Sequence, residues 1–249
     1  MNNIMEEKDQ DTAKVVRHNR LGKFWKPLAS AAIAAVAAVS MGMSAGAANA
    51  AATDITGYHH VDYVSVNYTG SAIKLGSNLE DTNWVPAGSY NIDVPSTTGA
   101  SGTGYIIPQT KDEAVARNVP WVGFSGDESL WGITGASASS QLTLNLTGAT
   151  YKPKTGSGTA TVTASQDGKT WFSASGFAAA PPATSNLPVT AGSHTFTFNG
   201  ESDDEVFHEH TQWVFSKAGT YNLTFSAKTT IGGVTYTAPA QQYTFKVGV

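Results

Sequence analysis

Residues 140–151, SQLTLNLTGATY, decide the fold class of this chain. Leu142, Leu144 and Leu146 occupy every second position, and polar residues separate them. Alternate side chains of a β-strand share a face, so this spacing predicts a strand that is buried on one face. Similar alternation recurs from Ile55 to the end of the chain, where no helical period is sustained. We therefore expect an all-β fold.

Turn signals divide the chain into short strands. Asp167-Gly168, within TATVTASQDGKTWFSASGF, and Gly232-Gly233 are typical two-residue hairpin turns, and Thr69-Gly70 separates two further strands. The helical candidate is the short segment Lys111–Asn118, and residues 177–188 are expected to form a long surface loop. Many short strands with regular turns favour an immunoglobulin-like β-sandwich.

The first 50 residues are predicted to be a secretory signal peptide that is cleaved from the fold. Residues 1–26 carry six Lys/Arg and four Asp/Glu, and an alanine-rich apolar run follows. This run closes on Ala48-Asn49-Ala50, a small-residue cleavage site. An uncleaved membrane anchor is the alternative, but the run lacks the Leu, Ile and Val density of a spanning helix. We expect residues 51–249 to form a single secreted domain. Before cleavage, the signal peptide is the only part of the chain that we expect to contact the membrane.

Charge and cysteine content exclude several classes of partner. Nine of the fifteen Lys/Arg and fifteen of the nineteen Asp/Glu lie after residue 50, so the predicted mature chain has a net charge of −6. Phosphate binding needs clustered Lys and Arg, so we expect no nucleic-acid partner. The chain has no cysteine. Its stability outside the cell must therefore come from the core, with a bound metal as a further source.

Residues 206–225, VFHEHTQWVFSKAGTYNLTF, hold two histidines one residue apart. We predict that this segment is a β-hairpin. Within a strand His208 and His210 would share a face, and Glu209 would point to the other. Two imidazoles on one face can bind the same metal ion, although a zinc site needs three or four ligands. Histidines that only pack or pair on an exposed strand remain the alternative.

His60 and Asp62 are the candidate partners of this pair. They are also two residues apart and would share a face if their segment is a strand. A site built from His60, Asp62, His208 and His210 requires the first strand of the domain to lie near the late strand. The sequence alone does not show this proximity.

Other kinds of chemistry have weaker support. The acidic run Glu201–Glu205 lacks the spacing of a calcium loop, so we expect a solvated turn. Trp84, Trp121 and Trp131 would provide a sugar-stacking platform if they were exposed, but buried tryptophan is more common. The sequence has no nucleophile elbow, no His-Glu-x-x-His motif and no phosphate-binding loop. We therefore expect no enzymatic activity.

Four blocks of sequence carry a family resemblance. They are GYHHVDYVSVNYTGSAIKL (57–75), VPWVGFSGDESLWGI (119–133), DGKTWFSASGF (167–177) and HEHTQWVFSKAGTYNLTFSAKTT (208–230). In this order they resemble the actinobacterial surface-anchored domain, also called the choice-of-anchor M or transporter-associated surface protein family. The last block, His-x-His-x-x-Trp-x-Phe followed by a short turn and Gly-x-Tyr, is the most specific.

The resemblance implies a secreted or wall-attached β protein that accompanies ABC importers of the zinc and manganese class. Matched by position, His60 and Asp62 fall in the first motif, and His208 and His210 fall in the last. The additional His59 leaves the register of the first motif open. Members of the family usually end in a wall-sorting signal or a membrane tail. This chain ends at YTFKVGV, so we expect release or retention by a partner.

Three functional hypotheses follow. The first is a non-enzymatic surface protein that binds a transition metal, or a metal-bearing ligand such as haem, and serves uptake with ABC metal-importer components or other surface proteins. Neutral imidazoles favour zinc for this site. The second is a carbohydrate-binding or adhesion module that uses the three tryptophans. The third is a purely structural surface protein.

Overall fold

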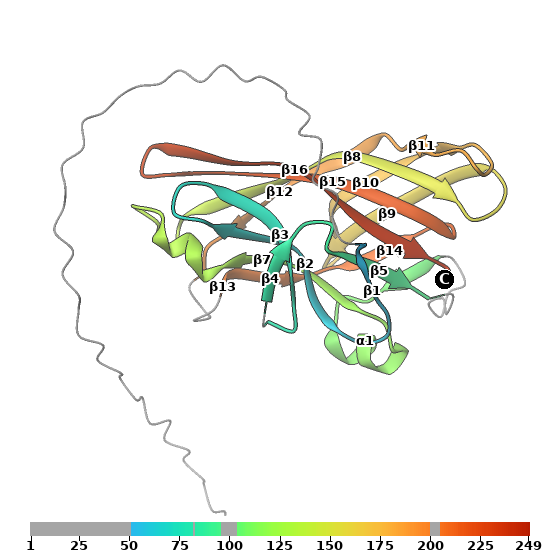
Figure 1. Ribbon diagram of the computed structural model, residues 1–249, viewed down its shortest axis with the longest axis horizontal. Helices are drawn as coiled ribbons and strands as arrows, with labels where there is room; N and C mark the ends of the chain where they lie inside the picture. Colours follow the sequence, from blue (N-terminus) through green and yellow to red (C-terminus); the bar gives the residue numbers. More distant parts are fainter. Residues whose placement is uncertain (1–50, 82, 96–103, 200–204) are drawn as a thin grey trace, which may run out of the picture. The chain divides into compact units, whose positions relative to one another are not determined.

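The computed structural model describes residues 51–81, 83–95, 104–199 and 205–249 (Figure 1). The predicted signal peptide lies outside these residues, so it stays a prediction. All described residues belong to one compact unit. Within the described ranges, no helix has the length and apolar character needed to cross a membrane.

The smaller of the two sheets has five strands. In spatial order they are β13 (Glu205–His210), β7 (Trp121–Asp127), β2 (His60–Tyr68), β3 (Ile73–Leu79) and β4 (Asn83–Pro86). β2 and β7 are parallel, and the other neighbours are antiparallel. The smaller sheet therefore combines strands from the beginning, the middle and the end of the domain.

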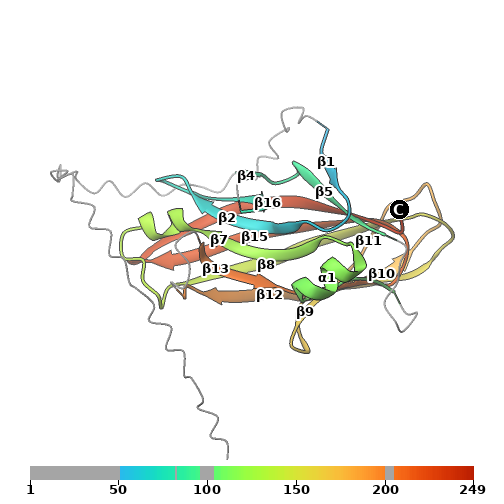
Figure 2. The same ribbon diagram turned by 90° about the horizontal axis from the view of Figure 1, so that it is seen from below.

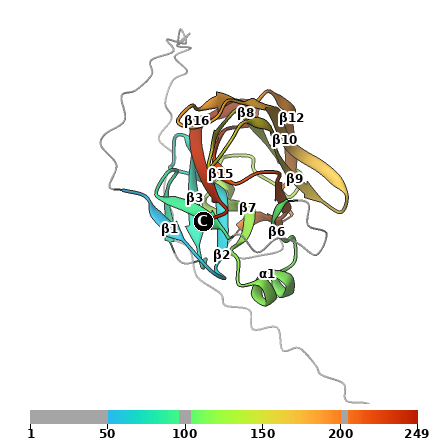
Figure 3. The ribbon, with the colours of Figure 1, turned by 90° about the vertical axis from the view of Figure 1, so that its right-hand side faces the viewer.

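The larger sheet has eleven strands. Its main path runs β1 (Thr53–Ile55), β5 (Tyr90–Val94), β16 (Val234–Val247), β15 (Gly219–Ile231), β8 (Gln141–Pro153), β12 (Val189–Thr197), β10 (Lys169–Ala178), β9 (Gly158–Gln166), β14 (Gln212–Phe215) and β6 (Tyr105–Ile107), and β11 (Ser185–Asn186) pairs with β8. Figure 3 shows that this sheet curls strongly. The two ends approach each other, because Gly248 donates a backbone hydrogen bond to Val94 and also lies beside Tyr105.

The two sheets pack face to face around an aromatic core. Phe124 of β7 contacts the rings of Trp171, Phe172, Trp213 and Phe225, all from the larger sheet. The three leucines of β8 that define its alternation are buried, as their spacing predicts. The all-β prediction is confirmed, and the immunoglobulin-like type stays a prediction.

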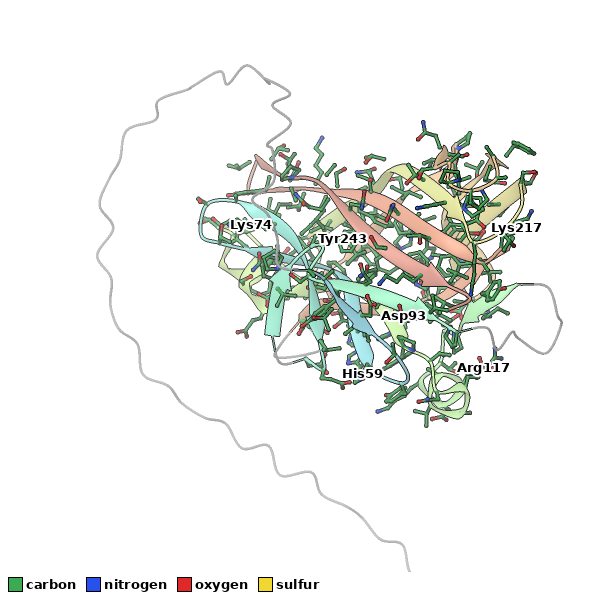
Figure 4. All side chains as sticks on the ribbon, turned by 45° about the vertical axis from the view of Figure 1, so that its right-hand side comes forward. His59, Lys74, Asp93, Arg117, Lys217 and Tyr243 are labelled. Atoms are coloured by element: carbon green, nitrogen blue, oxygen red, sulfur yellow. The ribbon has the colours of Figure 1, made fainter. Side chains whose placement is uncertain are left out.

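Two tyrosines also join the sheets by hydrogen bonds. The hydroxyl of Tyr243 on β16 donates to the carbonyl of Gly76 on β3 (Figure 4). The hydroxyl of Tyr63 on β2 donates to the carbonyl of Thr244 and accepts from its backbone N–H. Because Tyr63 and Tyr243 are fully buried, these bonds supply the partners that their hydroxyls require.

The hairpin predictions at the two-residue turns are confirmed. Asp167 and Gly168 connect β9 and β10, and Gly232 and Gly233 connect β15 and β16. All four residues have positive φ, between 49° and 79°, as a turn that matches the strand twist requires. The predicted helix is α1 (Lys111–Arg117), and a short 3-10 helix, η1 (Glu128–Gly132), follows β7.

The hairpin predicted over residues 206–225 is wrong. β13 joins the smaller sheet beside β7, whereas β14 joins the larger sheet between β9 and β6. β15 pairs with β8 and β16, not with β14. The buried residue Thr211 marks the change of sheet. The reason is long-range packing, because Trp213 and Phe215 bury against Phe245 of β16.

The loop expected at residues 177–188 is only partly irregular. β10 continues to Ala178, and Ser185–Asn186 forms the short strand β11 against β8. The side chain of Phe177 is exposed. Within the predicted loop, the residues outside strands are therefore 179–184 and 187–188.

Candidate metal centre

The central strand β7 brings β2 and β13 together. The three strands lie side by side (Figure 2). In their register, Asp62 and His210 flank Gly123 in one row across the sheet. His60 is paired with Trp121, and His208 with Ser125. The first and last histidine motifs therefore meet across a strand that neither motif contains.

These side chains project from the face of the smaller sheet that is turned away from the larger sheet. Phe124 points into the core between the sheets, and its neighbours Gly123 and Ser125 therefore face the opposite way. His60 and Asp62 alternate in the same manner with the fully buried Val61. This face is nevertheless covered, since His60, Asp62 and His210 are all buried.

Gly123 permits the approach of His210. A Cβ atom at residue 123 would lie 2.9 Å from Cε1 of His210 and 3.0 Å from the carbonyl oxygen of Glu209. Real Cβ contacts of this length essentially do not occur, so a side chain here would displace the histidine. On β7 the ring of Trp121 stacks on His210 with a centroid distance of 3.5 Å and an interplanar angle of 8°. Glycine and tryptophan together fix the position of this imidazole.

Four ligand atoms converge at the centre of the cluster. The Nε2 atoms of His60, His208 and His210 lie 2.9–3.1 Å from one another. Oδ1 of Asp62 lies 3.6 Å, 3.0 Å and 3.9 Å from these three nitrogens in the same order. Four ligands about 2.0–2.1 Å from a tetrahedral zinc ion would be about 3.3 Å apart. The measured separations bracket this value, so the group could hold a metal ion.

Acidic residues orient two of the three imidazoles. Nδ1 of His60 lies 3.2 Å from Oδ2 of Asp81, and Nδ1 of His208 lies 2.9 Å from Oε2 of Glu205. A neutral imidazole carries one N–H group, and its donation to a carboxylate leaves the Nε2 lone pair facing the centre. Lone pairs that face one another this closely repel, unless a cation or a proton lies between them.

The third imidazole, that of His210, has a different environment. Its Nδ1 atom has no partner in hydrogen-bond geometry among the described residues, although the backbone of Val122 is close enough to favour protonation slightly. Burial, together with the charges of His208 and His60, lowers the pKa of His210 to about 2. His210 is therefore neutral and available as a ligand across the physiological range.

Burial also changes the protonation of the charged members of the cluster. Burial raises the pKa of Asp62 to about 6, against the opposing effect of His208. For His208, burial would lower the pKa, but Asp62 and Glu205 outweigh it and raise this pKa to about 10. Both carboxylate oxygens of Asp62 lack a partner in hydrogen-bond geometry, even though Nε2 of His208 is near. The cluster thus requires positive charge, which a proton on His208 or a metal ion can supply.

The structure brings together all four predicted site residues and separates their neighbours. His59 (Figure 4) points away from the cluster, and its Nδ1 atom lies 3.0 Å from Oε1 of Glu80 at the surface. Of the two adjacent histidines, His60 is therefore the one whose side chain is directed into the cluster. Glu209 accepts a 2.6 Å hydrogen bond from Gln166, which agrees with its expected direction opposite to His208 and His210.

The sequence analysis missed the supporting residues. The sequence predicts a solvated acidic turn at Glu205, but this residue begins β13. The rest of that run, 201–204, lies outside the described residues. Asp81 and Gly123 were not singled out. The signal for Asp81 was its position in the turn after β3, since β3 pairs with the strand that carries His60. Only the register across three strands reveals the role of Gly123.

The three candidate sugar-stacking tryptophans are all half-buried. The ring of Trp121 stacks on His210, and Trp131 packs edge-to-face on Phe198. Trp84 lines a groove of about 420 Å³ between β3, β4 and β16. Of the three, Trp84 is the residue whose position is compatible with a surface ligand.

The chain matches no protein-family model, and no curated protein and no solved structure matches it at a significant level.

Proposed function

We propose that the chain is a non-enzymatic metal-binding protein whose ligands are His60, Asp62, His208 and His210. The observation that carries this proposal is the convergence of three Nε2 atoms and one buried carboxylate oxygen within 3.9 Å. Protein sites with four ligands are closed, whereas catalytic zinc sites keep one position for water or substrate. A complete ligand set therefore supports binding rather than catalysis.

The ligand set favours zinc among the transition metals. Imidazole and carboxylate ligands suit zinc, and the near-tetrahedral separations match its usual geometry. The side chain of His208 is 32% exposed, whereas that of Asp62 is fully buried. Metal exchange should therefore occur on the side of His208. A site that is reachable from solvent is consistent with metal capture and delivery.

The biological setting that we propose is metal uptake at the cell surface. The predicted signal peptide supports secretion, and the resemblance of four sequence blocks to transporter-associated surface proteins supports association with an ABC-type metal importer. Components of such an importer, or other surface proteins, are the proposed partners. This setting rests on the sequence patterns, whereas the metal site rests on the geometry.

Metal content of the purified protein tests the proposal. The protein is exposed to a buffered mixture of divalent metals, and bound metal is measured by elemental mass spectrometry. We expect about one zinc per chain in the wild type and loss of zinc in the His208→Ala/His210→Ala variant. The matched control is His59→Ala, because His59 is adjacent to the site but directed away from it. Absence of metal from the wild type would refute the proposal.

A further inference from the structure

Three carboxylates lie beside the histidine cluster. They come from Asp62 on β2, Asp81 in the turn after β3, and Glu205 at the start of β13. One oxygen from each lies within 4.8 Å of the others. Three like charges at this separation repel strongly unless a cation offsets them.

Asp62 is the member that points to a ligand. Its side chain is fully buried, and neither oxygen has a partner in hydrogen-bond geometry. Its Oδ1 atom lies 3.0–3.9 Å from the Nε2 atoms of the three histidines. A buried carboxylate whose second oxygen also lacks a partner is costly, because desolvation is not compensated.

Histidines, rather than lysine or arginine, are the ion-pair partners of Asp62 and Asp81 within the described residues. Lys246 of the larger sheet forms its ion pair with Asp54 on β1, away from this cluster. The grouping of Asp62, Asp81 and Glu205 is therefore a second set of ligand atoms beside the histidines.

We propose that a second divalent cation, of the hard, oxygen-preferring class, binds between Asp62, Asp81 and Glu205. This inference rests on the proposed function, because Asp62 then bridges the two cations with one oxygen toward each. Calcium, manganese and magnesium prefer carboxylate oxygens, whereas imidazole favours zinc. Asp81 is exposed, so water can complete the coordination of the second ion.

The contacts of Asp81 and Glu205 to histidine are compatible with this role. A carboxylate has two oxygens and can accept an imidazole N–H with one while it binds a cation with the other. The contact of Asp81 to His60 uses Oδ2. The two acids therefore connect the positions, and the second cation also fixes the orientation of the ligands of the first.

Manganese binding to the zinc-loaded, full-length protein tests the second position. The protein is first loaded with one zinc per chain. Mn²⁺ is then added, and free Mn²⁺ is followed by its electron paramagnetic resonance signal, while a zinc-sensitive dye reports any zinc release. We expect one Mn²⁺ to bind per chain with zinc retained.

Two conservative variants locate the site. Asp81→Asn and Glu205→Gln keep an oxygen that can accept the histidine N–H but remove one negative charge each. We expect at least an about tenfold weaker affinity for Mn²⁺, with zinc still bound. The matched control is Asp112→Asn, an exposed acid on α1, which should bind Mn²⁺ as the wild type does.

Each outcome separates this inference from the proposed function. One retained zinc without Mn²⁺ binding overturns the second site and leaves the first intact. Release of zinc in proportion to added Mn²⁺ also overturns it, since one position then serves both metals. If Asp81→Asn weakened zinc and Mn²⁺ binding equally, Asp81 would only position His60, and the result would overturn its role as a ligand of the second cation. Absence of zinc from the wild type overturns both proposals.

Discussion

Two histidines in this protein stack on tryptophan in nearly the same way. His210 lies on Trp121 at 3.5 Å and 8°, and His194 lies on Trp171 at 3.7 Å and 12°. Burial lowers the pKa of both rings. Stacking and burial are therefore common to a candidate ligand and to a histidine that only packs.

The difference lies in the groups that face each ring. His210 faces two further imidazoles and a buried carboxylate. The other ring neighbours of His194 are Phe172 and Phe196, and within the described ranges no ion pair involves it. Convergence of several donor atoms, rather than the environment of a single ring, therefore distinguishes a metal ligand from a packed histidine.

The largest expected difference between the two histidines is in metal affinity. His210→Ala removes one of four ligands, and we expect zinc to bind at least about a hundredfold more weakly, because loss of supporting groups alone costs 10–100-fold. His194→Ala should leave zinc affinity unchanged. Competition titration with a zinc chelator measures both variants. Equal weakening in the two variants would contradict the assignment.

The pH dependence of zinc affinity should also separate the two environments. The raised pKa of His208 means that zinc must displace one proton at neutral pH. Affinity should therefore fall about tenfold per unit as pH drops from 9 to 6. Below pH 6, Asp62 also becomes protonated, and the slope should steepen. Zinc titrations across this range check the slope, and a flat profile would exclude His208 as a ligand.

A substitution at Gly123 tests whether zinc binding needs the close approach of His210 to β7. Gly123→Ala places a methyl group against His210, and we expect a loss of about 1–3 kcal/mol in stability together with weaker zinc binding. Gly148→Ala on β8 is the control, because the nearest contact of its added Cβ would be 3.7 Å, to Thr224. Thermal denaturation and zinc titration compare the two variants. Normal zinc binding by Gly123→Ala would show that the close approach is not needed.

The smallest expected effect is the contribution of His194 to the loss of folding stability at acidic pH. Burial lowers its folded-state pKa, so below the unfolded value of about 6.5 the unfolded chain takes up the proton first. The wild type should lose stability as pH falls below 6.5, whereas His194→Phe should lack this contribution. The ring is half-buried, so we expect less than about 0.5 kcal/mol. Denaturant unfolding at pH 7 and pH 5 in both proteins measures it.

The sequence predicts those parts of the fold that depend on neighbouring residues. Alternation in β8 and the turns at Asp167-Gly168 and Gly232-Gly233 are local signals, and the structure confirms them. The hairpin over residues 206–225 fails because pairing of β14 depends on burial against distant strands. Local turn chemistry cannot decide between two sheets.

Local sequence signals also predict only part of the candidate site. Same-face spacing identifies His60 with Asp62 and His208 with His210 as two pairs. Their meeting depends on the order of strands in the smaller sheet, where β7 intervenes. Nothing in the spacing predicts this order. The supporting acids Asp81 and Glu205 also lie in or beside turns, where carboxylates are usually only solvated.

The distance along the chain between the two histidine motifs has a consequence for folding. A cation held by both His60 and His210 would join positions 150 residues apart, in a chain without cysteine. Closing a loop of about 100 residues restricts the unfolded ensemble by about 4–5 kcal/mol in the chain-entropy treatment. The bound metal would therefore act as a reversible cross-link that acid or a chelator can open without redox chemistry.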